Sequence, residues 1–262
     1  MIVKANGIQI HYEISGKKEG PVVVLSHSLS ASLHMWDPQM AALEPRFQVL
    51  RYDTRGHGGT EVTRGAYSLE MLGEDAIGLL DALRIDTVHW IGLSMGGMIG
   101  QCLALNHARR LRSLALCDTG SVVPEESQPL WDERIAAARN QGMAALVEAT
   151  MERWFTPSFW QKKSPMAVQI REQFLATSPQ GYIGCAEAIR RVNYLNRLAE
   201  IKIATLIVVG EDDQGTPVAA SQAMNERIQG SKLVVLPSAR HLSNVEQPEA
   251  FNAALLQFLQ SL

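Results

Sequence analysis

The chain has 262 residues, of which 46% are hydrophobic and 19% charged, and its formal net charge at pH 7 is −3. This composition is ordinary for a globular protein with a sizeable core, and the small charge gives no reason to expect nucleic acid or an anionic membrane as a partner. No apolar run approaches the roughly 18 residues of a membrane-spanning helix. Residues 1–12 contain no run long enough for a secretory signal.

The cysteines fit an intracellular location. Cys102, Cys117 and Cys185 are scattered and odd in number, which argues against a disulfide framework. Each lies in an apolar run, where a free cysteine usually behaves as a small buried hydrophobic residue. We therefore expect a cytoplasmic protein.

Short apolar runs alternate with longer amphipathic segments. Residues 8–14 alternate apolar and polar side chains, as expected of an antiparallel strand at a sheet edge. Short runs bounded by Gly, Pro or Asp predict further strands at 22–27, 47–53, 87–93, 111–118, 204–211 and 232–238. Helical spacing of apolar residues occurs at 68–84, 95–108, 217–229 and 246–261. The alternation predicts an α/β fold, with a mostly parallel twisted sheet flanked by helices.

One region breaks this alternation. Residues 125–195 contain no convincing strand, only helical segments separated by Pro and Gly, and they hold three of the five tryptophans. A helical insertion between two strands of such a sheet is typical of a lid over the edge where these folds bind ligands. We expect a core of residues 1–124 and 196–262 with a helical lid at 125–195; an ordinary helical subdomain is the alternative.

The most specific motif is the G-x-S-x-G sequence at 92–96, between a predicted strand and a predicted helix. In such an elbow the serine takes a strained backbone conformation that projects its hydroxyl above the sheet, and small neighbours let strand and helix pass closely. This context predicts that Ser94 is a nucleophile. A glycine-rich turn without catalytic function is the alternative.

A serine hydroxyl needs a neighbouring base to remove its proton. His241 follows the last predicted strand, at the same sheet edge as Ser94, and is the expected base. The carboxylate that orients the base has two candidates, because Asp213 follows one predicted strand and Asp118 ends another. The chain order Ser, Asp, His fits either of them.

An oxyanion hole needs two backbone N–H groups aimed at the developing charge. We expect these to be the amide of Met95, directly after Ser94, and the amide of Leu29, in the loop after the strand at 22–27. Zinc-binding spacings such as H-E-x-x-H are absent, and this chemistry requires no metal or organic cofactor.

Together these motifs resemble the α/β-hydrolase superfamily over essentially the whole chain. The similar stretches are 27–29 with Trp36 downstream, 53–58, 92–96, 210–213 and His241. In that superfamily the last position of the Gly-x-x-Asp motif holds the catalytic acid, which points to Asp213 rather than Asp118 or Asp212. The resemblance also implies that His27, Arg55 and His57 support the loops and transfer no protons.

A closer resemblance is to the 3-oxoadipate enol-lactonases of aromatic catabolism. The similar stretches are 25–40, 49–58, 92–101, 153–156, 181–190 and 241–251, so they cover both the core and the expected lid. The chain departs from those lactonases in the oxyanion loop, where they tend to carry Asn-Ser-Leu-Gly and residues 27–30 read His-Ser-Leu-Ser.

The expected reaction is hydrolysis of a small-molecule lactone or carboxylic ester through an acyl-enzyme. The resemblance favours 3-oxoadipate enol-lactone as the substrate. A general carboxylesterase, an acyl-homoserine-lactone hydrolase, a carbon–carbon bond hydrolase and a cofactor-free perhydrolase would use the same residues. A non-catalytic ligand sensor is an alternative of another class. Self-association of the chain is left open.

Two residues of the expected lid are predicted to bind substrate. A buried carboxylate on the substrate needs a charged partner, and the fork of an arginine suits it. Arg190 lies on a predicted helix in a stretch that resembles the enol-lactonase lid, and Trp154 is expected to form a wall of the pocket. The alternative for Arg190 is a solvated position on a helix that packs through its other face.

Overall fold

The computed structural model describes residues 1–262 and contains one eight-stranded sheet, with the strand order β1-β2-β4-β3-β5-β6-β7-β8. The strands are β1 (Ile2–Ala5), β2 (Ile8–Gly16), β3 (Val22–Ser26), β4 (Gln48–Tyr52), β5 (Val88–Leu93), β6 (Leu111–Cys117), β7 (Ala204–Gly210) and β8 (Lys232–Leu236). The pairs β1–β2 and β2–β4 are antiparallel, and all other pairs are parallel. The predicted fold class is confirmed.

Helices cover both faces of the sheet because its central strands are apolar on both sides. Val24 on β3 belongs to one hydrophobic cluster, and its neighbours Val23 and Leu25 belong to the other. One face packs against α2 (Leu69–Ala82), α3 (Met95–Asn106) and α9 (Val218–Arg227). The other packs against α1 (Asp37–Leu43) and α11 (Pro248–Gln260), and α11 follows the short α10 (Ser243–Glu246). None of the helices is both long and apolar enough to cross a membrane.

The N-terminal edge differs from the sequence prediction. The strand expected at the edge is β2, which instead lies between β1 and β4. The edge strand β1 has only four residues, and its apolar first residue, Ile2, is 62% exposed. Its sequence therefore lacks the alternation of apolar and polar residues that would have predicted a strand. The helix α1 was also not predicted, because its seven residues give too few helical turns for a clear apolar period.

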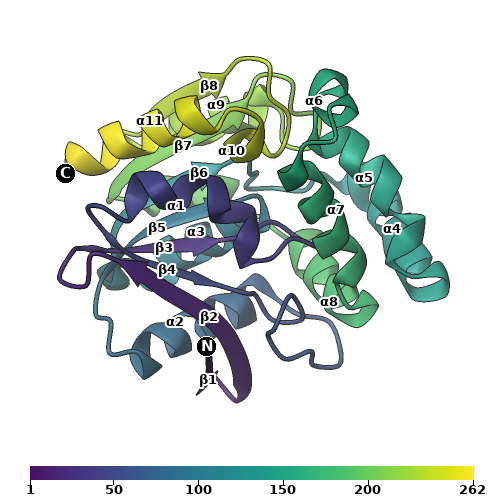
Figure 1. The fold of residues 1–262 in the computed structure, drawn as a ribbon, viewed down its shortest axis with the longest axis horizontal. Helices are drawn as coiled ribbons and strands as arrows, with labels where there is room; N and C mark the ends of the chain where they lie inside the picture. Colours follow the sequence, from purple (N-terminus) through teal and green to yellow (C-terminus); the bar gives the residue numbers. More distant parts are fainter.

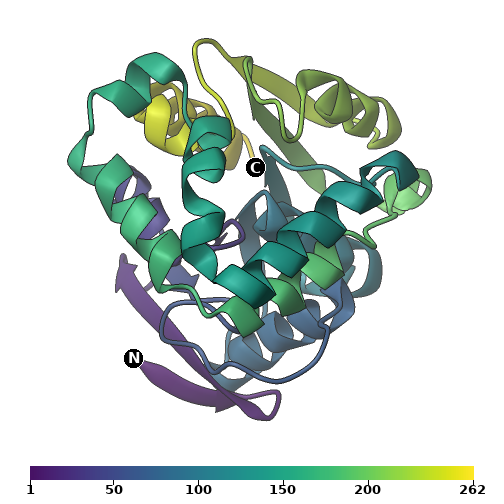
Figure 2. The same ribbon diagram turned by 90° about the vertical axis from the view of Figure 1, so that its right-hand side faces the viewer.

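Five helices lie between β6 and β7, at the right of Figure 1, opposite the C terminus. They are α4 (Gln128–Gln141), α5 (Val147–Trp154), α6 (Pro157–Gln161), α7 (Pro165–Ala176) and α8 (Pro179–Ile189). Four of them carry a proline in their first turn, where its missing N–H costs no hydrogen bond. Figure 2, viewed from this end, shows these helices spread across the near face of the molecule.

The helical insertion contacts the core through close backbone approaches. A Cβ on Gly181 of α8 would lie 2.1 Å from the carbonyl oxygen of Gly56, so only glycine fits between these two backbones. Nearby, the amide of Tyr67 donates to the carbonyl of Gly184 at 3.1 Å. At the other side of the insertion, the amide of Leu242 donates to the carbonyl of Trp154 at 3.2 Å. These contacts fix α5 and α8 over the end of the sheet.

The loop after β4 is anchored by a buried ion pair. Arg55 donates through Nε to Asp75 Oδ2 at 2.7 Å and through Nη2 to Asp75 Oδ1 at 2.5 Å, and both side chains are buried. Removal of one partner leaves a buried charge without compensation, which costs about 3–5 kcal/mol. We therefore expect Asp75→Ala to lower the free energy of unfolding in urea by about this amount.

The matched control is Asp81→Ala. Asp81 pairs with Arg110 at 2.8 Å but is 62% exposed, and exposed pairs contribute about 0–1 kcal/mol. Equal losses of stability in the two variants would show that the buried Arg55–Asp75 pair contributes no more than the exposed Asp81–Arg110 pair.

Candidate active site

Ser94 lies at a strained turn between β5 and α3. Its backbone angles are φ 54° and ψ −114°, a region that costs a non-glycine residue about 1–3 kcal/mol. The turn is held from both sides, because the amide of Ser94 donates to the Cys117 carbonyl at 2.8 Å. Its own carbonyl accepts from the Gly97 amide at 2.9 Å and from the Thr119 hydroxyl at 2.7 Å. The geometry is that of the elbow that the G-x-S-x-G motif predicts.

The glycines of the elbow are required by close packing. A Cβ on Gly92 would lie 2.1 Å from the carbonyl oxygen of Gly96, and a Cβ on Gly96 would lie 2.1 Å from the carbonyl oxygen of Ser26. Strand β5, helix α3 and strand β3 therefore meet at van der Waals distance beneath Ser94. This explains why small residues stand two before and two after the serine.

His241 and Asp213 form a hydrogen-bonded pair at the same edge of the sheet. His241 lies in the loop between β8 and α10, and its Nδ1 is 2.8 Å from Oδ2 of Asp213, in the loop after β7. Asp213 Oδ1 accepts from the amides of Gly215 and Thr216 at 2.7 and 3.1 Å, and Oδ2 accepts from the Thr216 hydroxyl at 2.6 Å. Three donors thus hold the carboxylate against the imidazole. No hydrogen bond joins His241 to the Ser94 hydroxyl in this structure.

In this buried site, each charged group of the pair stabilises the charged form of the other. Burial opposes ionisation of Asp213, but the charge of His241 and the hydrogen bonds from His241 and Thr216 outweigh it, so the pKa of Asp213 lies below its ordinary value. Burial likewise opposes protonation of His241, but the charge and hydrogen bond of Asp213 raise the pKa of the imidazole above 6.5. The ring nitrogen facing away from Asp213 remains available to take a proton.

Asp118, the other candidate acid, has different partners. It directly follows β6, at φ 42°, and is fully buried. Its Oδ1 accepts from the Gly210 amide at 2.8 Å, and its Oδ2 accepts from the hydroxyl of Ser243 at 2.5 Å. Burial and the charge of Asp213 raise its pKa well above the ordinary value. Asp118 therefore joins β6, β7 and α10 beneath the pair but does not contact the His241 ring.

The two amides expected to form the oxyanion hole, those of Met95 and Leu29, make no hydrogen bond within the protein. Met95 is the first residue of α3, where a helix leaves its backbone N–H without an intrahelical partner. In the loop after β3, the Ser28 amide donates to Met35 Sδ at 3.3 Å and the Ser30 amide to His57 Nε2 at 2.9 Å. The intervening Leu29 amide makes no such bond. It is therefore free to donate to a ligand.

Neutral imidazoles support the oxyanion loop. His57 accepts from the Ser30 amide, and its Nδ1 lies 3.2 Å from the carbonyl of Arg55. His27 accepts from the Thr54 amide at 2.9 Å through Nε2, while Nδ1 lies 2.7 Å from the Ser28 carbonyl. Burial lowers the pKa of both rings, that of His57 to about 3. These contacts agree with the supporting role that the superfamily resemblance implies for both histidines.

The two predicted substrate-binding residues lie in different surroundings. Trp154 is buried at the end of α5, and its ring stacks on the His241 ring with centroids 6.4 Å apart. Arg190, at the end of α8, donates to Gln128 at 2.8 Å and to Asp132 at 2.6 Å, both on α4. Its guanidinium also lies 3.8 Å from Glu187. The geometry points away from a substrate-binding role for Arg190, because its charge is already neutralised within the insertion.

Sequence reasoning did not identify two residues that hold the buried carboxylates, nor two arginines of the insertion that lack a carboxylate partner. Thr216 and Ser243 hold the two carboxylates, but serine and threonine after a strand are too common to be informative. Arg134 and Arg153 are half-buried on α4 and α5 without a carboxylate partner. A sequence gives no signal for this, since the missing partner is a property of the folded chain.

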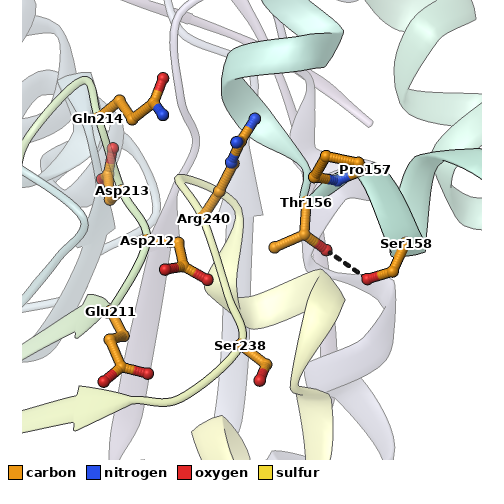
Figure 3. Close-up of a pocket in the computed structure, with 9 residues that line it drawn as sticks. All are labelled: Thr156, Pro157, Ser158, Glu211, Asp212, Asp213, Gln214, Ser238 and Arg240. Carbon is orange, nitrogen blue, oxygen red and sulfur yellow. Dashed lines mark hydrogen bonds between the residues drawn. The ribbon is translucent and has the colours of Figure 1, made fainter.

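A polar cavity of about 630 Å³ lies on the outer side of the Asp213 loop. It is lined by residues 156–158, 211–214, Ser238 and Arg240. Figure 3 shows Arg240 projecting between the Asp213 loop and the Thr156–Pro157 turn. Asp213 lines this cavity but neither Ser94 nor His241 does, so it is not the space over the serine.

A strained serine turn and a His–Asp pair at the carboxyl edge of a mostly parallel sheet define an α/β hydrolase. The comparison with protein families agrees. The model described as "alpha/beta hydrolase fold" matches residues 21–248, and the chain belongs to this family.

Named relatives cover nearly the whole chain. The chain is 35% identical over 251 residues to "3-oxoadipate enol-lactonase 2" of Acinetobacter baylyi, covering 96% of this chain and 93% of the relative. The crystal structure of an enol-lactonase from Burkholderia xenovorans LB400 superposes with a TM-score of 0.96 and 38% identity, covering 99% of this chain and 100% of that one. A putative carbamate hydrolase of Caulobacter is 31% identical, with 95% of both chains covered. The resemblance to enol-lactonases seen in the sequence is confirmed.

Proposed function

We propose that the protein is a serine hydrolase that opens a small lactone through an acyl-enzyme, with 3-oxoadipate enol-lactone as the favoured substrate. The observation that carries the proposal is the His241–Asp213 pair, 2.8 Å apart, at the same sheet edge as the strained Ser94. The full-length similarity to two enol-lactonases supports the choice of substrate.

In the proposed mechanism, His241 takes the proton of the Ser94 hydroxyl through Nε2, and the serine oxygen attacks the lactone carbonyl. Asp213 holds the imidazole in the tautomer with its proton on Nδ1 and stabilises the imidazolium that forms. The amides of Leu29 and Met95 donate to the oxyanion, and each such donor contributes about 2.7–4 kcal/mol in a comparable hydrolase.

A lactone adds one feature to this scheme. When the ring C–O bond breaks, the leaving oxygen takes the proton from His241 but stays tethered to the acyl group on Ser94. Water, deprotonated by the now neutral His241, attacks the acyl carbon and releases an open-chain acid. The leaving group of an enol-lactone is an enol, which becomes a ketone, so the products cannot readily reclose the ring.

The helical insertion is part of the proposal. Residues 1–124 and 196–262 would form the catalytic core, and residues 125–195 a lid that shields the acyl-enzyme. Trp154 supports this arrangement, because it belongs to the insertion and stacks on His241. We also propose a cytoplasmic location. The three cysteines are free and buried, as expected for a protein in a reducing compartment.

Hydrolysis of a carbamate is a second candidate function, favoured by the relative that is named a putative carbamate hydrolase. The catalytic groups would be the same, so only turnover separates the candidates. The deciding experiment measures kcat/KM on the enol-lactone, an acyl-homoserine lactone, a short-chain 4-nitrophenyl ester and a carbamate. A preference for the enol-lactone supports the proposal, and a preference for the carbamate overturns its substrate. No turnover of any of them indicates a ligand sensor.

The pH dependence of the reaction should report His241. A general base must be neutral, and Asp213 raises the pKa of His241 above 6.5. We expect kcat/KM on a neutral ester to rise with pH through a single apparent pKa above 6.5. Asp213→Asn removes the charge that raises this pKa, so the midpoint of the remaining activity should move down. A profile that is flat between pH 5 and 9 would rule out His241 as the base.

A further inference from the structure

Two arginines of the helical insertion have no carboxylate or main-chain carbonyl partner, unlike the other buried or half-buried arginines of the chain. Eight arginines of the chain are buried or half-buried. Five of them pair with carboxylates: Arg51, Arg55, Arg110, Arg171 and Arg190. A sixth, Arg240, donates to main-chain carbonyls at the end of α5. Arg134 on α4 and Arg153 on α5 have neither kind of partner, so they carry two partly desolvated charges without an anion.

The two arginines belong to one cluster with Tyr182 of α8. Helix α4, which carries Arg134, packs against α8, which carries Tyr182. Burial raises the pKa of the Tyr182 phenol, and the charges of both Arg134 and Arg153 lower it. Arg153 Nη2 donates only to the Thr150 hydroxyl, at 3.0 Å. The Arg134 guanidinium lies over the ring of Trp131, 5.2 Å from its centre. Neither contact neutralises a charge.

This arrangement is unfavourable without a ligand. Partly buried like charges lose hydration and repel each other, and both effects disfavour the charged form. Burial, followed by the charge of Arg134, lowers the pKa of Arg153 to about 10. An anion between the two guanidinium groups would remove the repulsion and supply the missing hydrogen-bond acceptors.

The cluster lies beside the candidate catalytic groups. Arg153 immediately precedes Trp154, whose ring stacks on His241 and whose carbonyl accepts from the Leu242 amide. Burial has the largest effect on the pKa of His241 and lowers it. The charges of Asp213 and Asp118 raise this pKa, and the charge of Arg153 lowers it. Arg153 therefore lies near enough to the His241 ring for its charge to act on the imidazole.

We propose that Arg134, Arg153 and Tyr182 form a binding site for a carboxylate carried by the substrate, which makes the protein selective for anionic lactones and esters. This inference rests on the proposed function and narrows its substrate class. It fits the favoured substrate, because adipate is a dicarboxylate and closure of one lactone leaves one carboxylate free. These three residues take the role that the sequence analysis gave to Arg190, because the Arg190 guanidinium is already paired with Asp132.

The test compares two esters of equal chain length, 4-nitrophenyl hydrogen glutarate and 4-nitrophenyl pentanoate. The first ends in a carboxylate and the second in a methyl group. We expect Arg153→Gln and Arg134→Gln each to raise KM for the glutarate ester about 10- to 100-fold, the usual loss for one charge-assisted hydrogen bond. KM and kcat for the pentanoate ester should change less than about threefold, because that ester does not use the arginines.

Two further variants make the comparison specific. Arg139→Gln, an exposed arginine on the same helix as Arg134, should leave the kinetics of both esters unchanged. Arg190→Gln should affect both esters equally, through the packing of α8 on α4. Selective loss on the glutarate ester in Arg190→Gln, or equal losses on both esters in Arg134→Gln and Arg153→Gln, would overturn the assignment.

A binding measurement separates this inference from the proposed function. Glutarate, which carries the same carboxylate without an ester, should raise the melting temperature of the wild-type protein and of Ser94→Ala, but not that of Arg153→Gln. Glutaramide is the neutral control and should have no effect. If no ester is hydrolysed but glutarate still stabilises in this pattern, the proposed hydrolysis fails and the anion site stands. If esters are hydrolysed but glutarate and glutaramide act alike, the anion site fails and the hydrolase stands.

Discussion

Ser94→Ala is expected to abolish hydrolysis, with kcat falling by about five to six orders of magnitude. The serine oxygen is the only group at the elbow that can form the acyl-enzyme, and the strained turn projects it from the backbone at φ 54°. His241→Ala should cost about as much, and the double variant little more, because a nucleophile and its base act as one unit. The measurement is kcat on a 4-nitrophenyl ester and on the enol-lactone.

The control for this prediction is the fold of each variant. Ser94→Ala removes one oxygen and leaves the backbone bonds of the turn to Cys117 and Gly97 in place. Its melting temperature should therefore stay close to that of the wild-type protein. Near-normal turnover by a folded Ser94→Ala protein would overturn the proposed function as a whole.

The second large effect is expected at the acid. Asp213→Asn should lower kcat by about 10⁴-fold, because an amide in place of the carboxylate can donate to Nδ1 of His241 and so favour the wrong tautomer. KM should change little, since Asp213 lies behind the imidazole. The measurement is kcat and KM at a pH above the midpoint of the acidic limb, so that the proton equilibrium of His241 does not contribute.

Asp118→Asn is the matched control, because it makes the same chemical change in the other buried carboxylate. Asp118 contacts the Gly210 amide and the Ser243 hydroxyl instead of the imidazole, and its raised pKa favours a neutral group that asparagine resembles in shape. We expect a loss in kcat of less than about tenfold. A larger loss in Asp118→Asn than in Asp213→Asn would reverse the assignment of the acid.

The sequence predicted the fold well because local patterns and tertiary packing agree over most of the chain. All seven predicted strands are present in the sheet, and the elbow at 92–96 has the backbone that its glycines predict. The two elements that were missed are the short helix α1 and the slightly buried strand β1. The edge strand β1 has one buried residue, Ala5, among its four, so no period was visible in its sequence.

The proposed acid and the proposed anion site show where sequence reasoning ends. The choice of Asp213 over Asp118 came from a family motif, because chain order alone fits both; the contact with His241 appears only in the structure. Arg190 and Arg153 also look alike in sequence, since each lies at or near the end of a helix of the insertion. They differ in whether a carboxylate from another helix reaches them, and the partner of Arg190 is Asp132, 58 positions earlier in the chain.

The neutral histidines beneath the oxyanion loop have a consequence for how the protein responds to acid. His57 accepts a hydrogen bond from the Ser30 amide, so protonation of Nε2 would break this anchor and introduce a charge into a fully buried position. Because the pKa of His57 lies near 3, the anchor persists through the whole range in which His241 gains its proton. Mild acidification should therefore protonate the proposed base His241 while this anchor stays in place, and a return to neutral pH should restore activity without rebuilding the proposed oxyanion loop.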